Sequence, residues 1–175
     1  MLGGVTLLHG DKVTLRTAVP SDIAELARIR STAAVLGRWP VADEGLEAEL
    51  AADVAGEDGT EFLAVELNGA VVGAIQWAAE HDPMYRHAGM DIYLDPAVHG
   101  RGVGTDAVRT LARHLVHTLG HHRLVIDPAV DNEPAIRCYA KVGFRPVGVM
   151  RQYERGADGE WHDGLLMDLL ADELT

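Results

Sequence analysis

The chain has 175 residues, of which 47% are hydrophobic and 24% are charged, as in ordinary globular domains. This composition excludes fibrous and disordered proteins, and no apolar run approaches the roughly 20 residues that cross a bilayer. The formal net charge of −12 disfavours nucleic acid as a partner, and it either aids solubility alone or attracts a polycationic substrate. We expect one domain over residues 1–175.

The N-terminal residues and the cysteine content indicate a location. Met1–Asp11 contains no basic segment followed by an apolar stretch, so a signal peptide is not expected. The single cysteine, Cys138, cannot form an intramolecular disulfide, which fits a reducing cytoplasm. We therefore expect a cytoplasmic monomer or homodimer that does not bind membranes.

Periodicity divides the N-terminal half into strands and helices. Asn68-Gly69 lies between two β-rich runs and predicts a hairpin, and Ser21 is the expected N-cap of the first helix. The expected strands are Lys12–Thr17, Glu61–Leu67 and Val71–Trp77. The expected helices are one that Pro20-Ser21-Asp22 opens and a weaker one over Ala42–Val54.

The C-terminal half alternates strands and helices. Gly120 and Gly143 are expected to end the two helices, because glycine readily takes the left-handed conformation. The expected strands are Met90–Leu94, Arg123–Ile126, Phe144–Arg151 and Glu160–Leu169, and the expected helices are Thr105–Leu119 and Glu133–Val142. The order of elements predicts a mixed α/β domain with no internal boundary.

A glycine-rich turn joins the strand at Met90–Leu94 to the following helix. Its residues are His99-Gly100-Arg101-Gly102-Val103-Gly104-Thr105. Glycines allow a close backbone approach, and a helix N-terminus favours anions, so a phosphate or diphosphate is expected here. The Gly-Lys-Ser/Thr ending of a nucleotide-binding loop is missing, and the dinucleotide fingerprint does not fit. Arg101 either adds a cation to the phosphates or is a solvated loop charge.

This turn resembles the pyrophosphate loop of the GNAT acetyltransferases, Arg/Gln-x-x-Gly-x-Gly/Ala, with His99 in place of the usual first residue. Backbone amides do most of the work of that loop, so the resemblance still implies binding of acetyl-coenzyme A. The residues implied to bind it are Ile92, Tyr93, Leu94, His99, Gly100, Arg101, Gly102, Val103, Gly104, Thr105, Asn132, Ala135 and Tyr139.

A second segment, Asp131–Phe144, resembles the GNAT signature Asn-x-x-Ala-x-x-x-Tyr-x-x-x-Gly-Phe. Asn132 is placed to cap a helix, and Ala135 and Tyr139 share one helix face at a spacing of four residues. The family implies that Tyr139 is the general acid that protonates the departing thiolate; the alternative is a core tyrosine. Cys138 is not interpreted as a nucleophile, because no histidine partner can be identified for it.

Within the superfamily, the residues around Asp91 and Asp127 resemble aminoglycoside 6′-N-acetyltransferases. The resemblance implies that Asp91 is the base toward the amine and that Asp127 binds the substrate. A cationic acceptor must lose a proton before it attacks a thioester, and a nearby carboxylate provides for this. The alternatives are a surface residue for Asp91 and a turn-forming residue for Asp127.

The other walls of the acceptor pocket are expected by analogy. The candidates are Trp39, Asp43, Glu44, Trp77 and Asp163. The alternative for the tryptophans is core or lid packing. The nine histidines form no recognised metal spacing, so no metal is expected.

The resemblance implies the GNAT acyl-CoA N-acyltransferase fold, with a mixed central sheet of about seven strands flanked by about four helices. It implies direct transfer of an acetyl group from acetyl-CoA to the 6′-amine of an aminoglycoside, with a backbone N–H near Tyr93 polarising the thioester. Two alternatives stay open. One is an acetyltransferase that acts on protein N-termini or on another small-molecule amine, because the Trp161–Met167 segment also resembles such enzymes. The other is a non-catalytic acyl-CoA sensor.

Overall fold

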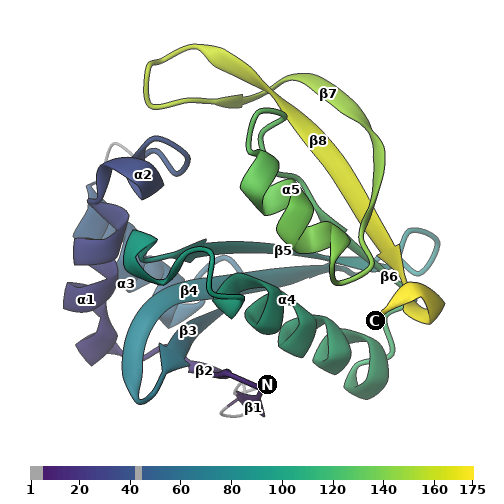
Figure 1. Cartoon of the computed structure of the whole chain (residues 1–175), viewed down its shortest axis with the longest axis horizontal. Coiled ribbons are helices and arrows are strands. Elements are labelled where there is room, and N and C mark those ends of the chain that lie inside the picture. The colour runs from purple at the N-terminus through teal and green to yellow at the C-terminus, as the bar shows by residue number, and fades with distance from the viewer. Residues whose placement is uncertain (1–5, 42–44) are drawn as a thin grey trace.

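The computed structural model describes residues 6–41 and 45–175. Its centre is one sheet of eight strands in the order β1-β2-β3-β4-β5-β6-β8-β7 (Figure 1). The strands are β1 Leu7–His9, β2 Val13–Thr17, β3 Glu61–Leu67, β4 Ala70–Glu80, β5 His87–Leu94, β6 Arg123–Ile126, β7 Arg145–Arg155 and β8 Trp161–Leu170. The predicted mixed sheet is confirmed. The sequence analysis missed β1, a three-residue edge strand that is too short to show a periodic pattern.

Five α-helices accompany the sheet in the described residues. They are α1 Ile23–Arg30, α2 Ala33–Leu36, α3 Leu46–Ala55, α4 Val103–Arg113 and α5 Glu133–Ala140. The short helical turns are η1 Pro20–Asp22, η2 Pro96–Val98, η3 His114–Thr118 and η4 Ala171–Glu173. The four-residue α2 was not predicted, because a single helical turn has no amphipathic repeat. Among the described residues, no helix is both long and apolar enough to cross a membrane.

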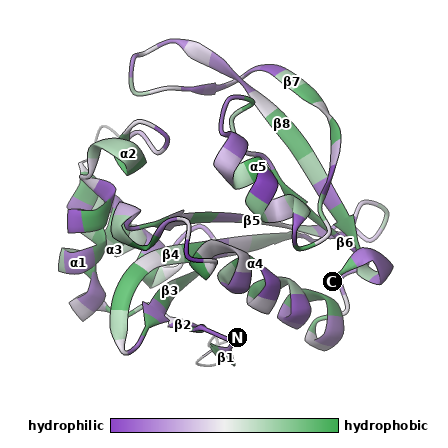
Figure 2. Cartoon of the chain, viewed as in Figure 1, coloured by the Kyte–Doolittle hydropathy of each residue, from purple (hydrophilic) through white to green (hydrophobic). Residues whose placement is uncertain are grey.

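The helices cover both faces of the sheet. The larger core cluster joins Leu111 of α4 and Leu115 of η3 to Leu15 and Ile75 of the strands. The smaller cluster places Leu26 and other residues of α1, α2 and α3 against the opposite face. Figure 2 shows hydrophobic segments along the strands and helix faces that meet in these layers. Burial of the two apolar faces is the main stabilisation of such a layered domain.

Local signals at the element ends were mostly interpreted correctly. Gly120 and Gly143 take φ values of 70° and 117°, as expected of glycines that end helices. The prediction that Ser21 is the N-cap of the first helix is wrong, because Asp22 is the N-cap of α1. Its carboxylate accepts a hydrogen bond from the Val19 N–H at 2.8 Å and is ion-paired with Arg16 at 2.7 Å. Hydrogen bonding to Arg16 lowers the pKa of Asp22.

The sheet opens between β5 and β6. Within the described residues this parallel ladder contains two pairs, Ala88 with Leu124 and Gly89 with Val125. Beyond them β5 continues to Leu94 along β4, whereas β6 ends at Ile126 and pairs on its other side with β8. The second half of β5 therefore faces a gap rather than a neighbouring strand. This gap is where a ligand can reach the middle of the sheet.

Candidate active site

The glycine turn lies at the N-terminus of α4. Gly100 and Gly102 have φ values of 71° and 78°, in the left-handed region that favours glycine. Asp106, in the first turn of α4, accepts hydrogen bonds from the backbone N–H groups of Lys12 at 2.7 Å and Val13 at 3.0 Å. The Lys12 ammonium also donates to the carbonyl of Arg101 at 2.8 Å. The start of β2 therefore holds the turn in place.

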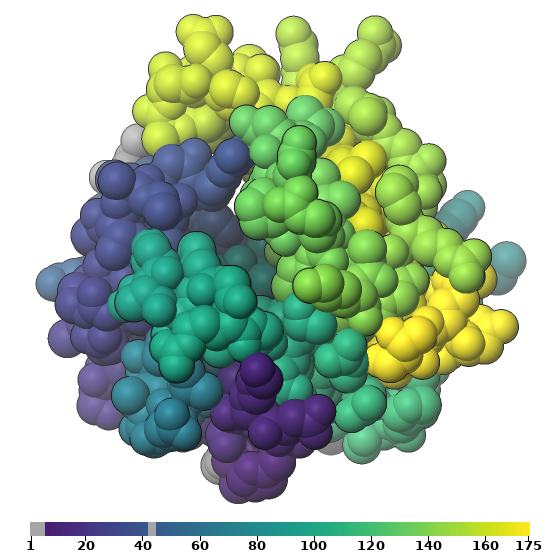
Figure 3. Space-filling view, viewed as in Figure 1, coloured from purple at the N-terminus to yellow at the C-terminus, as the bar shows by residue number. Residues whose placement is uncertain are grey.

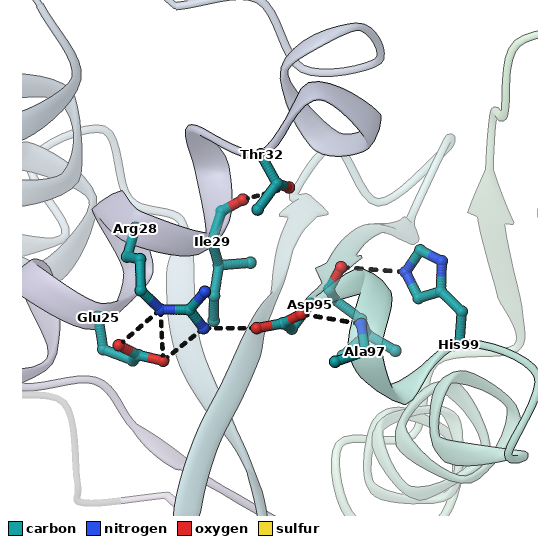
Figure 4. A network of polar contacts seen from close by, with 8 residues as sticks. Glu25, Arg28, Ile29, Thr32, Asp95, Ala97 and His99 are labelled. Carbon is teal, nitrogen blue, oxygen red and sulfur yellow. Dashed lines mark hydrogen bonds and ion pairs between the residues drawn. The ribbon is translucent and has the colours of Figure 1, made fainter.

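A polar network fixes the segment that precedes the turn (Figure 4). Arg28 of α1 is ion-paired with Asp95, whose carboxylate also accepts from the Ala97 N–H at 2.9 Å. His99 Nε2 donates to the Leu94 carbonyl at 3.0 Å, which ties the turn back to the end of β5. The unusual first residue of the motif thus has a role in this chain: its ring sets the geometry of the loop.

A cavity of about 480 Å³ extends from the glycine turn between α2 and α5. Figure 3 shows the surface hollowed there, between the blue α2 region, the teal turn and the green α5. The predicted coenzyme residues that line it are Ile92, Tyr93, Leu94, His99, Gly100, Gly102, Val103, Gly104, Thr105, Asn132, Ala135 and Tyr139. The exception is Arg101, whose side chain is exposed and does not line the cavity.

Gly104 lines this cavity, and a Cβ there would be in van der Waals contact with Cys138 Sγ and Leu94 Cδ1, both at 3.4 Å. Arg137 and Lys141 of the α5 region add cations to the lining, and sequence reasoning had not selected them. Burial raises the pKa of the Cys138 thiol, which lies 3.3 Å from the Thr105 hydroxyl. The thiol is thus a packing group and not an activated nucleophile.

A second cavity of about 210 Å³ adjoins the first. Its lining includes four carboxylates, those of Glu49, Asp91, Asp127 and Glu154, and two guanidinium groups, those of Arg30 and Arg38. Both cavities are lined by Arg38, Trp39, Ile92, Asn132 and Tyr139, so they meet at these residues. One cavity is thus rich in backbone donors and the other in carboxylates. Tyr139 lies at the junction between them.

Asp91 lies on β5 opposite Gln76 of β4, where the sheet has opened. Its carboxylate accepts a hydrogen bond from the Ile92 N–H at 3.0 Å. Burial, followed by the negative charges of Asp127 and Glu154, raises the pKa of Asp91 to about 7. A carboxylate with this pKa can take a proton from a bound cation near neutral pH.

Tyr139 is 6% exposed and projects from α5, next to the ring of Phe144 at a centroid distance of 6.3 Å. Burial, reinforced by the charge of Asp91, raises its pKa well above the usual 10. The phenol therefore keeps its proton across the neutral range and can act as a donor. Asn132 supports the helix, because its side chain accepts from the Ala135 N–H at 3.4 Å.

Trp39 lines both cavities and packs edge-on against Tyr93 with ring centroids 5.0 Å apart. Beneath it lies Arg30, which is fully buried, ion-paired with Glu49 at 2.9 Å, and 5.0 Å from the Trp39 ring centroid. The sequence analysis did not select Arg30 as a site residue. Nothing local distinguishes it, since its partner Glu49 lies on another helix.

The structure places two expected acceptor residues elsewhere. Trp77 pairs with Met90 and faces the larger core cluster, on the opposite side of the sheet from Asp91, and packs against the His121 ring. Asp163 accepts from the Gln152 N–H at 2.7 Å and lines neither cavity. The sequence analysis missed Glu154, which does line the second cavity. Two further candidates, Asp43 and Glu44, lie outside the described residues.

Comparison with known proteins accounts for this arrangement. The family model described as an acetyltransferase (GNAT) domain matches residues 12–145. An aminoglycoside N(6′)-acetyltransferase type 1 from Klebsiella pneumoniae is 32% identical over 158 residues, which covers 80% of this chain and 77% of that protein.

Two solved structures are similar over nearly the whole chain. Mycobacterium smegmatis RimJ in complex with CoA-disulfide is 25% identical with a TM-score of 0.83, covering 97% of this chain and 88% of that one. AAC(6′)-Ib in complex with paromomycin and acetyl-CoA is 25% identical with a TM-score of 0.76, covering 93% and 96%. With the family model matching most of its length, the chain belongs to the GNAT acetyltransferase family.

Proposed function

We propose that the chain transfers an acetyl group from acetyl-CoA to a primary amine of a cationic small molecule, and that this amine is the 6′-amine of an aminoglycoside. One observation carries the proposal. The carboxylates of Asp91, Asp127 and Glu154 line a cavity that meets the coenzyme-type cavity at Tyr139. A polycation would be attracted to the carboxylates and would present an amine beside a proton acceptor and a proton donor.

The residues of the larger cavity suit the coenzyme. Acetyl-CoA supplies the acetyl group as an activated thioester. Backbone N–H groups from Gly100 to Thr105 lie at a helix N-terminus, where they would hold the diphosphate. Lys141 and Arg137 add positive charge to the same cavity. A backbone N–H of β5 near Tyr93 would polarise the thioester carbonyl, since this part of the strand faces the gap in the sheet.

Two side chains would move the protons. Asp91 takes a proton from the bound ammonium, which frees the nitrogen lone pair to form the new C–N bond. Tyr139 gives its hydroxyl proton to the sulfur as the C–S bond breaks. The second proton on nitrogen is released as the amide forms, and solvent restores the tyrosine. The raised pKa values of Asp91, to about 7, and of Tyr139 suit these opposite roles.

Two likenesses support different acceptors. The 32% identity to the Klebsiella pneumoniae enzyme and the likeness to AAC(6′)-Ib favour an aminoglycoside. The 36% identity over 78 residues to the N-alpha-acetyltransferase RimI of Mycobacterium tuberculosis, which covers 43% of this chain, supports an α-amine as the second candidate. The second cavity favours the first candidate, because its four carboxylates outnumber its two guanidinium groups and match a ligand with several ammonium groups better than a single N-terminal amine.

A panel of amines with detection of released thiol tests the proposal. The decisive comparison is a matched pair of aminoglycosides that differ only in an amine or a hydroxyl at the 6′ position. Turnover of the amine alone is expected. Equal turnover of the pair would exclude 6′ specificity, and turnover of peptides alone would transfer the function to the second candidate. A complete lack of turnover across the panel would leave the sensor hypothesis in its place.

A further inference from the structure

The pairing of β7 with β8 is interrupted beside the acceptor cavity. Met150 pairs with Gly164 and Glu154 pairs with His162, so residues 151–153 stand opposite Asp163 alone. Within this bulge Gln152 has a φ of 51°, which is uncommon for a residue with a side chain. Bulges redirect side chains and are frequent beside active sites. The residues that follow Gln152 are Tyr153 and Glu154.

Two residues of β8 shape the bulge. The Asp163 carboxylate accepts a hydrogen bond from the Gln152 N–H at 2.7 Å, which holds the unusual backbone conformation. Gly164 leaves room for the Tyr153 ring, because a Cβ at Gly164 would lie 2.8 Å from Tyr153 Cδ1 and 3.4 Å from its Cγ. The strand pair is therefore built to place the ring of Tyr153 at one position.

That position brings the Tyr153 hydroxyl to Asp127, a residue that lines the second cavity, although Tyr153 itself does not line it. It donates a hydrogen bond to Asp127 Oδ2 at 2.6 Å, across 26 residues of sequence. Asp127 follows β6 and lines the cavity together with Asp91. The side chain of Tyr153 is 46% exposed, so burial of its ring does not explain where it lies. The bond to a carboxylate does, since charge-assisted hydrogen bonds are the strong ones.

We propose that Tyr153 is a positioning residue of the acceptor site, which holds the Asp127 carboxylate in the orientation that receives the acceptor ammonium. The inference rests on the proposed function, because the acceptor site is assigned there. The bulge, Asp163 and Gly164 serve the same end by delivering the hydroxyl. Asp163 thus acts on the acceptor through Tyr153 and Asp127, and not by contact.

Tyr153→Phe is the direct test, because it keeps the ring and removes the hydroxyl. Tyr85→Phe is the matched control, since Tyr85 is exposed and lies outside both cavities. We expect the acceptor KM to rise about 5- to 30-fold in Tyr153→Phe, with kcat changed less than about threefold. The control should match the parent protein. An unchanged KM in Tyr153→Phe would overturn the proposal.

A second measurement needs no acceptor and therefore stands even if aminoglycosides are not the substrate. Carbon-13 NMR of labelled aspartate carboxylates follows the titration of Asp91 near pH 7 in the resting protein, with Asp91→Asn to assign the signal. Without the phenol, the charge of Asp127 is less compensated and acts more strongly on Asp91. The Asp91 midpoint should therefore rise by about half a pH unit in Tyr153→Phe. A midpoint equal to that of Tyr85→Phe would refute the positioning role.

The delivery of the hydroxyl is tested by a pair of variants at one position. Asp163→Ala removes the acceptor for the Gln152 N–H, whereas Asp163→Asn keeps a carbonyl oxygen there. The alanine variant should reproduce the KM and titration changes of Tyr153→Phe, and the asparagine variant should restore parent values. Parent behaviour in the alanine variant would show that the bulge stands without Asp163. Equal defects in both variants would show that the charge of Asp163 matters and not its hydrogen bond.

Discussion

The two cavities of this protein are formed by different parts of the chain. The coenzyme cavity draws on two short segments, residues 92–105 and 132–141, together with the α2 region. The acceptor cavity takes its charged side chains from separate parts of the fold, at Arg30, Arg38, Glu49, Asp91, Asp127 and Glu154. A ligand that does not change can be bound by the backbone of a fixed loop, which leaves a local sequence motif. A variable ligand is bound by side chains that only the fold brings together.

Tyr139 joins the two cavities, and its loss should have the largest effect. Tyr139→Phe removes the proton donor and is expected to lower kcat by about 10²–10⁴-fold. Coenzyme affinity should change little, because the ring still fills its place in α5. Steady-state kinetics and calorimetry with coenzyme A measure the two quantities, with Tyr85→Phe as control. Full activity across the pH range would reduce Tyr139 to a packing residue.

Gly104→Val tests the coenzyme cavity alone. A Cβ at this position would already touch Cys138 and Leu94 at 3.4 Å, so the valine methyl groups would extend into the cavity that Gly104 lines. We expect coenzyme A to bind about 100-fold more weakly, a loss of about 2.7 kcal/mol. Gly148→Val is the matched control, because Gly148 has open space around it and no positive φ. Equal coenzyme affinity in the two variants would show that the ligand does not pass Gly104.

The acceptor cavity should reveal itself through pH. Burial and the charge of Asp127 raise the pKa of Asp91 to about 7, and the base must be ionised to accept a proton. The acid limb of kcat/KM should therefore fall about tenfold per unit below pH 7. Asp91→Asn should lower activity and abolish that limb. A flat profile for the parent enzyme between pH 5.5 and 8.5 would exclude Asp91 as the base.

The same charge has a smaller effect on stability. The folded-state pKa of Asp91, about 7, exceeds the ordinary aspartate value of 3.8. The unfolded chain thus releases this proton first, and stability is lost as pH rises from about 4 to 7. Asp91→Asn should therefore stabilise the protein at pH 8 by about 1–2 kcal/mol, and by nothing near pH 4. Urea unfolding measures the difference.

An exposed acid serves as the control for that measurement. Asp172→Asn removes an exposed carboxylate in η4, at a residue that lines neither cavity. It should leave stability within about 0.5 kcal/mol at both pH values. If Asp91→Asn raises the free energy of unfolding at pH 8 no more than Asp172→Asn does, the Asp91 carboxylate is not held in an unfavourable environment.

The sequence predicted features whose cause lies within a few residues. Asn68-Gly69 predicted its hairpin, because both residues take positive φ values there, 52° and 80°. Asn132 predicted the start of α5, because its own side chain caps that helix. Most elements and the order of the two motifs could be predicted in this way. The first helix was correct although its cap was wrong, since hydrophobic periodicity does not depend on the cap.

Part of the second cavity could not be predicted, because its geometry is not local: Trp39, Asp91 and Asp127 were expected there and line it, whereas Arg30 and Glu154 were not expected. Glu154 reaches the cavity through a bulge, and a bulge breaks the alternation by which strand faces are assigned from sequence. Trp77 follows Gln76, the residue of β4 that pairs with Asp91. Its side chain therefore points to the opposite face of the sheet from Asp91. Arg30 acquires its role from Glu49 and Trp39, which neither adjoin it in sequence nor follow a motif.

The narrow seam between β5 and β6 has an evolutionary consequence. Two residue pairs join the strands β1 to β5 to the group formed by β6, β8 and β7. Insertions and substitutions in the β7–β8 hairpin therefore disturb few bonds of the larger part, where the glycine loop is fixed. Descendants of one ancestor can diverge in which amines they accept while keeping the same acyl donor.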